Sequence, residues 1–172
     1  MHSNSVRILV KEKENKEREY VVSKKDAELS ELLTGTINDY PDDPFVQLTD
    51  VEEKTIERVI DYLRHFKGVP PPEIPKPIPQ GDKDDEAFKK CMDEWSFNFI
   101  DKIGLDDLVS VTVTANFMGI QSLLDLCCAK FANLCKDKTE EDIFKVFNIT
   151  ETFTEEEKEK IRQENSWIEE NI

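Results

Sequence analysis

The apolar residues between positions 120 and 135 recur at steps of three and four, which is the spacing of neighbours on one face of an α-helix. Polar residues occupy most of the positions between them. This pattern predicts a core helix with one broad buried face. The residues of that face are Ile120, Leu123, Leu124, Cys127, Cys128, Phe131, Leu134 and Cys135.

Two short polar motifs after this helix predict where two more helices begin. Thr139 stands before three acidic residues in a near capping box, and Thr154 with Glu157 forms a full capping box. In such a motif the threonine hydroxyl accepts from a first-turn N–H, and the carboxylates favour the positive end of the helix. The first of the two helices carries Ile143, Phe144, Val146 and Phe147.

The last predicted helix has little apolar surface of its own. Ile161 is its one large apolar residue before Trp167 and Ile168. Such a helix does not stand alone, because helices in proteins are stabilised mainly by burying an apolar face. Either the core helix or another protein is therefore expected to cover the large apolar side chains nearby, which are Phe147, Ile149, Phe153 and Trp167.

Strict alternation of apolar and polar residues predicts strands near the N-terminus. Val6, Ile8 and Val10 alternate with polar residues, and an apolar stretch over 20–22 follows a charged turn over 11–19. Together they predict a hairpin with one buried face. A loop rich in Asn, Asp and Pro over 38–44 precedes a third short strand over 45–48.

Two helices are predicted on either side of this loop and strand. The first is capped by Ser23 and Asp26 and ends at Gly35. The second begins after a cap at Thr49 or Asp50 and ends near residues 67–68. Their inward residues are Ala27, Leu29, Leu32 and Leu33 in the first, and Ile56, Val59, Ile60 and Leu63 in the second.

A proline-rich stretch over 69–81 follows, and it cannot form a helix interior or a central strand because its prolines lack N–H donors. Two interpretations of this stretch are open. It is either a semi-rigid spacer within one domain, which is favoured, or a ligand for an aromatic groove of another protein. An amphipathic helix is then predicted from about 84 to 97, with Trp95 as an anchor into the core.

The sequence of residues 105–115 contains signals for both a strand and a helix. Val109, Val111 and Val113 stand among threonines, and such β-branched residues favour a strand on propensity alone. Asp106 and Asp107 instead suit the N-terminus of a helix. Periodicity does not decide between the two, although the segment taken alone would be assigned to a strand.

Composition limits the size of the protein and its class of partner. A chain of 172 residues suits one domain, or one domain with an appendage. The formal net charge of −15 argues against a nucleic-acid partner, since phosphate binding needs clustered Lys and Arg, and it favours basic or apolar partners. No apolar run is long enough to span a membrane, and residues 1–5 do not resemble a signal peptide. A cytoplasmic and nuclear location is expected.

The motifs of catalysis, metal binding and cofactor binding are missing. Cys91, Cys127, Cys128 and Cys135 are expected to be buried free thiols, because three of them lie on the apolar face and none has the spacing of a zinc ligand set. The glycines do not form a phosphate-binding loop, and no nucleophile stands beside a base. The protein is expected to be no enzyme and to use no cofactor.

Short motifs at fixed spacings run from residue 115 to residue 167. They are Ala115-Asn116-Phe117-Met118, Leu123-Leu124-Asp125, Ala132-Asn133, Lys138-Thr139, Phe147-Asn148-Ile149, Phe153-Thr154-Glu155-Glu156-Glu157 and Arg162-Gln163-Glu164-Asn165-Ser166-Trp167. In these motifs the chain resembles the S-phase kinase-associated adaptor family, whose members join a cullin scaffold to F-box proteins in SCF ubiquitin ligases.

The resemblance implies an α+β fold in two parts. Residues 1–136 would form a BTB/POZ-like domain, a three-stranded sheet packed by helices that binds the cullin and contains the linker over 68–82. Residues 137–172 would form a two-helix extension that binds the F-box. The segment 105–117 would be a buried helix, because packing overrides propensity there.

The resemblance also assigns residues to two binding surfaces. Asn116 and Phe117 match family positions that face the cullin, where most members carry tyrosine in place of Phe117. The F-box-facing positions are matched by Leu124, Phe131, Cys135, Ile143, Phe147, Ile149, Phe153 and Trp167. Members also usually carry aspartate at Gly119 and proline at Glu140.

The function that the resemblance implies is a non-catalytic adaptor, with ubiquitination performed by other subunits. A second hypothesis is a divergent structural paralogue that self-associates as a homodimer or larger assembly through its BTB-like surface. An elongin C-like adaptor is disfavoured, because that related family ends before the extension that contains Trp167.

Overall fold

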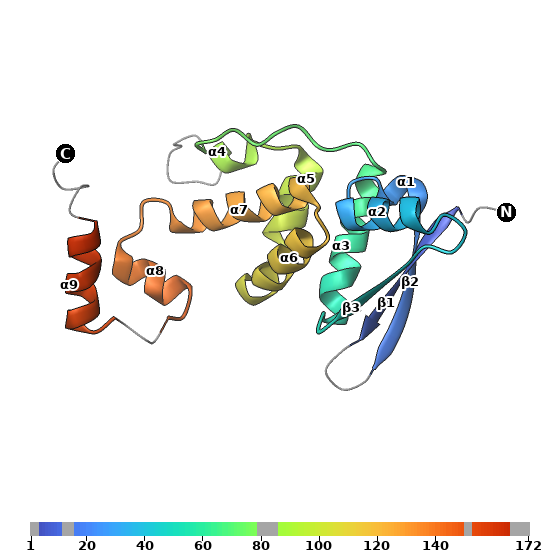
Figure 1. Ribbon diagram of the computed structural model, residues 1–172. Coiled ribbons are helices and arrows are strands. Elements are labelled where there is room, and N and C mark those ends of the chain that lie inside the picture. The colour runs from blue at the N-terminus through green and yellow to red at the C-terminus, as the bar shows by residue number, and fades with distance from the viewer. Residues whose placement is uncertain (1–3, 12–15, 79–85, 150–152, 166–172) are drawn as a thin grey trace. The chain divides into compact units, whose positions relative to one another are not determined.

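The computed structural model describes residues 4–11, 16–78, 86–149 and 153–165. The chain divides into two compact units, residues 1–134 and residues 135–172, which are described separately below (Figure 1). The first unit holds a three-stranded sheet and most of the helices, and the second holds the last two helices of the described chain.

The sheet confirms the predicted hairpin and the predicted third strand. Strand β1 (Ser5–Lys11) lies in the centre, antiparallel to β2 (Glu17–Ser23) and parallel to β3 (Phe45–Thr49). Alternate residues of β1 are buried, and in the parallel register Ile8 pairs with Val46 and Val10 with Leu48. The apolar face of the sheet therefore turns into the core.

The single helix predicted after the hairpin is wrong, because the chain forms two helices there. Helix α1 (Lys24–Ala27) begins at Ser23 as expected, but a second helix α2 (Glu31–Asp39) begins at Ser30. Gly35 lies inside α2 and does not end it. The reason is local: the Ser30 hydroxyl accepts from the N–H of Leu33 and so starts a new helical turn.

Helix α3 (Glu53–Phe66) buries the four apolar residues predicted for it. Its predicted cap is wrong, since the N-cap position is Glu52 and no side chain bonds to the first turn. Asp50 instead adopts a left-handed backbone, with a φ of 59°, and its N–H donates to the Lys11 carbonyl. The chain thus makes a tight turn between β3 and α3.

Residues 69–78 behave as a spacer that is fastened to the body of the first unit. Ile74 and Ile78 pack against the buried core, and the Lys76 ammonium lies 3.0 Å from the Asp125 carboxylate. These contacts agree with a spacer inside one domain, as the composition favoured.

The helix predicted from 84 to 97 is wrong as a single element. The structure has a short helix α4 (Glu86–Lys89) and then α5 (Glu94–Asp101). Asp93 separates them, because its carboxylate accepts from the N–H and the hydroxyl of Ser96, at 2.9 and 2.6 Å, and so caps α5. Trp95 is half-buried against the core, where its ring stacks between His65 and Phe99.

The segment that propensity assigns to a strand is helix α6 (Leu105–Phe117), so the strand is wrong and the helix implied by the resemblance is confirmed. Helix α7 (Gln121–Cys135) confirms the predicted core helix. Its buried face is rotated about the helix axis relative to the predicted face, because Leu126 and Ala129 are buried whereas Cys128 is exposed. Of the four cysteines, which are free thiols, Cys127 is the buried one.

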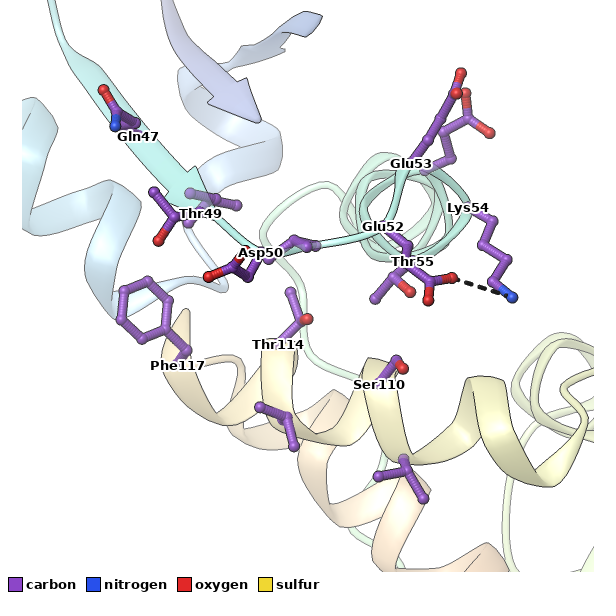
Figure 2. Close-up of a pocket in the computed structure, with 15 residues that line it drawn as sticks. Gln47, Thr49, Asp50, Glu52, Glu53, Lys54, Thr55, Ser110, Thr114 and Phe117 are labelled. Atoms are coloured by element: carbon purple, nitrogen blue, oxygen red, sulfur yellow. Dashed lines mark ion pairs between the residues drawn. The ribbon is translucent and has the colours of Figure 1, made fainter. Parts of the chain in front are cut away.

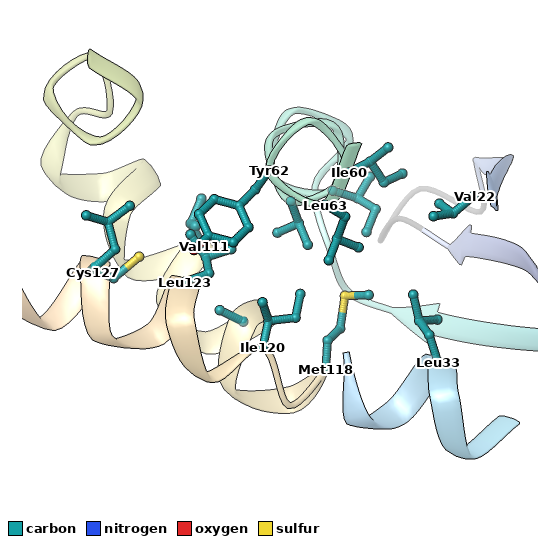
Figure 3. Packing of buried hydrophobic residues seen from close by; sticks show 14 of the residues in the cluster. Val22, Leu33, Ile60, Tyr62, Leu63, Val111, Met118, Ile120, Leu123 and Cys127 are labelled. Atoms are coloured by element: carbon teal, nitrogen blue, oxygen red, sulfur yellow. The ribbon is translucent and has the colours of Figure 1, made fainter. Parts of the chain in front are cut away.

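The core of the first unit collects side chains from the sheet and from each of the helices α1 to α7. In Figure 3, Leu33 of α2 and Leu63 of α3 point toward Met118 and Ile120 at the turn between α6 and α7. All four are fully buried. The core thus joins the strand-containing half of the unit to its helical half.

A polar junction ties the end of α6 to the start of α2. The buried Ser30 hydroxyl donates to the Met118 carbonyl at 2.6 Å, and the N–H of Leu32 donates to the same carbonyl at 3.3 Å. Gly119 follows with a φ of 63°, and a side chain there would meet the Cβ of Glu31 at 2.8 Å. Glycine is required because it permits both this backbone and this close approach.

The second unit contains α8 (Glu140–Val146) and α9 (Glu155–Glu164). Both predicted caps are confirmed: Thr139 accepts from the N–H of Asp142, and Thr154 forms a reciprocal capping box with Glu157. No residue of either helix is buried in the described part of this unit. Their caps define the helices, but packing within the unit leaves their apolar side chains accessible.

We predict that Ser30→Ala lowers the free energy of unfolding by about 1–3 kcal/mol, because it removes both the α2 cap and a donor to a buried carbonyl. Chemical denaturation would measure the change. Ser23→Ala is the matched control, since Ser23 caps α1 alone, and a loss of about 1 kcal/mol is expected there. Equal losses in the two variants would contradict a structural role for the bond to Met118.

Candidate functional site

A pocket opens on the first unit between the turn from β3 into α3 and the outer side of α6 (Figure 2). Its volume is about 1030 Å³, in the range of sites that hold a ligand or a partner's side chains. The walls come from residues 47–55 and Glu57 on one side, and from Val109, Ser110, Val113, Thr114 and Phe117 on the other.

The α6 wall of the pocket is an exposed apolar stripe. Val109, Val113 and Phe117 follow one another at steps of four, so they lie on one face of the helix. Their exposed fractions are 48%, 63% and 63%. Contiguous large apolar side chains on a surface are typical of a site that a partner covers.

The opposite wall is acidic. Four of its five charged residues are carboxylates, and two of them are neutralised: Glu52 pairs with Lys54, while Glu53 pairs with Arg18 and with Lys16. Asp50 and Glu57 are exposed and make no ion pair in the described chain. The pocket therefore carries unpaired negative charge beside its apolar stripe.

Asp107 ties α6 to α3 next to the pocket. Its carboxylate lies 2.7 Å from the Lys54 ammonium and 2.7 Å from the Arg58 guanidinium. The hydrogen bond from Lys54, followed by that from Arg58, lowers the pKa of Asp107 below its ordinary value. The same contact, with a second one from Glu52, raises the pKa of Lys54. Lys54 is thus already engaged and is a poor binder of a further anion.

Thr55 contributes a buried polar group to the pocket wall. The residue is 1% exposed, and its hydroxyl has no hydrogen-bond partner in the described structure. Figure 2 shows the side chain on the side of α3 that faces α6. An unpaired buried hydroxyl costs free energy, so the wall is not optimised for the stability of the isolated chain.

The two residues predicted to face a cullin lie side by side at the end of α6. Both are exposed, and Phe117 lines the pocket. Sequence reasoning missed Val109 and Val113, although they precede Phe117 at successive steps of four. The β-branched run favoured a strand, in which Val111 would share a face with Val109 and Val113. Only the helical period separates the buried Val111 from the two exposed valines.

The residues predicted to face an F-box are distributed over both units. Leu124 and Phe131 on α7 are half-buried against the core of the first unit. In the second unit Ile149 and Phe153 are 44% and 54% exposed. Trp167 lies outside the described residues. The remaining three, Cys135, Ile143 and Phe147, are half-buried.

Two observations on the described residues concern metal binding and cysteine chemistry. No group of three or more His, Cys, Asp and Glu residues is placed to hold a metal ion within that part of the chain. Burial raises the pKa of the Cys127 thiol to about 12, so it stays protonated and is a weak nucleophile. None of the helices described is both long and apolar enough to cross a bilayer.

Residues 121–168 match a family described as the Skp1 family, dimerisation domain. Over 168 residues the chain is 36% identical to the S-phase kinase-associated protein 1 homolog of Tetrahymena thermophila, which covers 98% of this chain and 96% of that protein. The chain belongs to the Skp1 family. Its α+β architecture with a three-stranded sheet agrees with the BTB/POZ-like fold that the resemblance implied.

Two further Skp1-family relatives carry names that refer to a complex. The SCF ubiquitin ligase complex protein SKP1a of Dictyostelium discoideum is 35% identical over 163 residues, 94% of this chain and 96% of that protein. The E3 ubiquitin ligase complex SCF subunit sconC of Arthroderma benhamiae is 35% identical over 156 residues, 88% of this chain and 90% of that protein.

We predict that Asp107→Asn lowers the free energy of unfolding at neutral pH by less than about 1 kcal/mol, since the lost ion pairs lie at the surface. Because the folded-state pKa of Asp107 is lowered, its stabilisation is complete above the unfolded-state value of 3.8 and is lost as pH falls through the folded-state value. The difference from the unmodified chain should therefore shrink below about pH 4.

The control for this prediction is Asp106→Asn, which removes a charge from the same helical turn without touching Lys54 or Arg58. Denaturation curves at several pH values would compare the two variants. A loss for Asp106→Asn as large as that for Asp107→Asn would assign the effect to the helix dipole and contradict the role of the ion pairs.

We also predict that Thr55→Val raises the free energy of unfolding by about 1 kcal/mol, because a methyl group replaces a buried hydroxyl that has no partner. Thr112→Val is the matched control on α6, since its hydroxyl donates to the Leu108 carbonyl at 2.6 Å and that bond would be lost. Thermal unfolding would compare the two. A destabilised Thr55→Val variant would show that the hydroxyl is bonded in solution.

Proposed function

We propose that the chain is a non-catalytic adaptor of an SCF-type E3 ubiquitin ligase, which joins a cullin scaffold to F-box substrate receptors. Membership of the Skp1 family supports this proposal, together with the SCF complex named for two relatives that match most of the chain. The single structural observation that carries it is the exposed apolar stripe of α6, which ends at Phe117.

The cullin-binding side of the proposal rests on the pocket of the first unit. Phe117 stands at the end of the stripe formed with Val109 and Val113, and the residue is 63% exposed to solvent. The isolated chain gains nothing from leaving these side chains in water, whereas a partner that covers them would gain the free energy of apolar burial. Asn116 would supply a polar contact at the edge of the same surface.

The F-box-binding side rests on the second unit. Its helices bury no residue, and Ile149 and Phe153 are exposed although both are large and apolar. Short helices of this polarity gain little stability from propensity alone. We infer that an F-box domain packs on these side chains and completes the apolar cover that the unit lacks.

Light scattering after size exclusion would test the function. We expect the chain to form a one-to-one complex with an F-box domain and a one-to-one-to-one complex when a cullin N-terminal domain is added. Phe117→Ala should weaken cullin binding alone, and Phe153→Ala should weaken F-box binding alone. Each loss should be about 30-fold or more, since truncating an anchor aromatic at an interface commonly costs about 2 kcal/mol.

Two variants control this experiment. Phe117→Tyr keeps the ring and should bind the cullin domain within a few-fold of the unmodified chain. Val21→Ala removes an exposed apolar side chain from β2, where it is 51% exposed and does not line the pocket, and should change neither affinity. A free chain that doubles in mass with concentration and does not bind the cullin domain would refute the adaptor and favour the self-associating paralogue.

A further inference from the structure

We propose that the open edge of strand β3 and the apolar stripe of α6 form a groove for an extended peptide, which joins the sheet as a fourth strand. The occupant is a linear segment of another protein that is rich in β-branched or aromatic residues and poor in acidic residues. This inference does not rest on the adaptor function, because it requires neither a cullin nor an F-box protein. It assigns a second kind of partner to the pocket.

One side of β3 has no neighbouring strand in the described chain, because the sheet order is β2-β1-β3. Hydrogen bonds at the two ends of β3 show which backbone groups face β1. At one end the Pro44 carbonyl accepts from the N–H of Arg7 at 3.0 Å. At the other end the N–H of Asp50 donates to the Lys11 carbonyl at 2.9 Å. The even-numbered residues of the strand therefore direct their backbone groups to β1.

The odd-numbered residues of β3 direct their backbone groups to the open side, since successive residues of a strand alternate. They are Phe45, Gln47 and Thr49. Because none of them is a proline, each offers an N–H donor and a C=O acceptor to an added strand. No strand of the described chain uses these groups. This row of donors and acceptors is what strand addition requires.

The opposite edge of the sheet is protected against such pairing. On β2 the Arg64 guanidinium donates to the Val21 carbonyl at 3.3 Å, and the strand begins with three charged residues over 17–19. Both features hinder pairing with another chain. Strand β3 has no charged residue in its five positions, although 35% of the chain is charged. It is therefore the edge of the sheet at which another strand can add.

The pocket borders this open edge. Gln47 and Thr49 line it from β3, and the stripe of α6 lines it from another side. Figure 2 shows β3 passing the end of α6 that carries Phe117. A groove between a strand edge and a helix suits an extended peptide, because the edge supplies main-chain bonds while the helix contacts every second side chain. The exposed valines and Phe117 of the stripe would contact the apolar side chains of the peptide.

Charge favours a peptide over a second copy of the chain as the occupant. Pairing of β3 with the β3 of a second copy would bring together two chains that each carry a formal net charge of −15. Asp50 and Glu52 line the pocket next to the strand, so the repulsion would act close to the edge. A peptide with few acidic residues avoids this repulsion. β-branched and aromatic residues suit it further, because they favour an extended backbone.

Phage display of random heptapeptides tests the groove, with the full chain and two variants of Gln47 as separate baits. Gln47→Pro removes one outward N–H and leaves the bonds to β1 in place, because that N–H faces away from β1. Gln47→Ala is the matched control, since it keeps the N–H. Peptides enriched on the unmodified chain should bind Gln47→Pro about tenfold more weakly or worse, and Gln47→Ala within about twofold.

Amide hydrogen exchange of the full chain gives a readout that does not depend on the folding of a variant. In the free chain the amides of Gln47 and Thr49 should exchange quickly, whereas those of Val46 and Leu48 are bonded to β1 and should exchange slowly. A saturating enriched peptide should slow the first pair about tenfold or more. N-methylation of the peptide at alternate residues is the control, because methylation of one alternating set should abolish this protection and methylation of the other should not.

Three outcomes would overturn the proposal. They are the absence of any enriched peptide on the unmodified chain, equal binding to Gln47→Pro and Gln47→Ala, and protection of Gln47 that rises with the concentration of the free chain. The last result would make a second copy the occupant.

The same experiments separate this inference from the proposed function. A chain that binds the cullin domain but enriches no peptide leaves the adaptor standing and refutes the groove. A chain that enriches peptides through the N–H of Gln47 but does not bind the cullin domain supports the groove and refutes the adaptor.

Discussion

The packing of α6 on α3 is the contact on which the candidate cullin surface depends. Helix α6 is rich in β-branched residues, which do not favour a helix in isolation, and it is stabilised where Leu108 and Val111 are buried in the core. Once those residues turn inward, the period of the helix forces Val109 and Val113 outward. The apolar stripe is thus a geometric consequence of burying the other face, and Asp107 adds ion pairs that tie the two helices together.

The junction between α6 and α2 sets where that stripe ends. Ser30 satisfies the Met118 carbonyl while it caps α2, so one hydroxyl stabilises two helix ends at once. Gly119 allows the two backbones to approach more closely than a residue with a Cβ would permit. Because Phe117 immediately precedes this junction, its position is determined by contacts that do not involve its own side chain.

The two candidate surfaces differ in how they use apolar side chains. On the first unit the exposed stripe lies on a helix whose other face is fully buried, so a partner meets a preformed wall. In the second unit the exposed Ile149 and Phe153 belong to a unit whose helices bury no residue, so a partner would complete the packing. In the proposed adaptor, the cullin would therefore dock on a pre-organised surface, and the F-box would complete the apolar packing of the second unit.

The sequence by itself determined the elements whose signals are local. The alternation around Ile8 predicted a strand, the period of α7 predicted a core helix, and the threonine caps at Thr139 and Thr154 predicted two helix starts, because each pattern reports backbone geometry over a few residues. Without the family resemblance, only the tertiary structure decided that residues 105–117 form a helix. It also decided that the helix around Trp95 begins anew at Asp93 and that Cys128 is exposed. It also brought residues 47–57 and residues 109–117 together around one pocket, although the two segments are more than 50 positions apart along the chain. Such contacts depend on how helices pack, which local propensity does not encode.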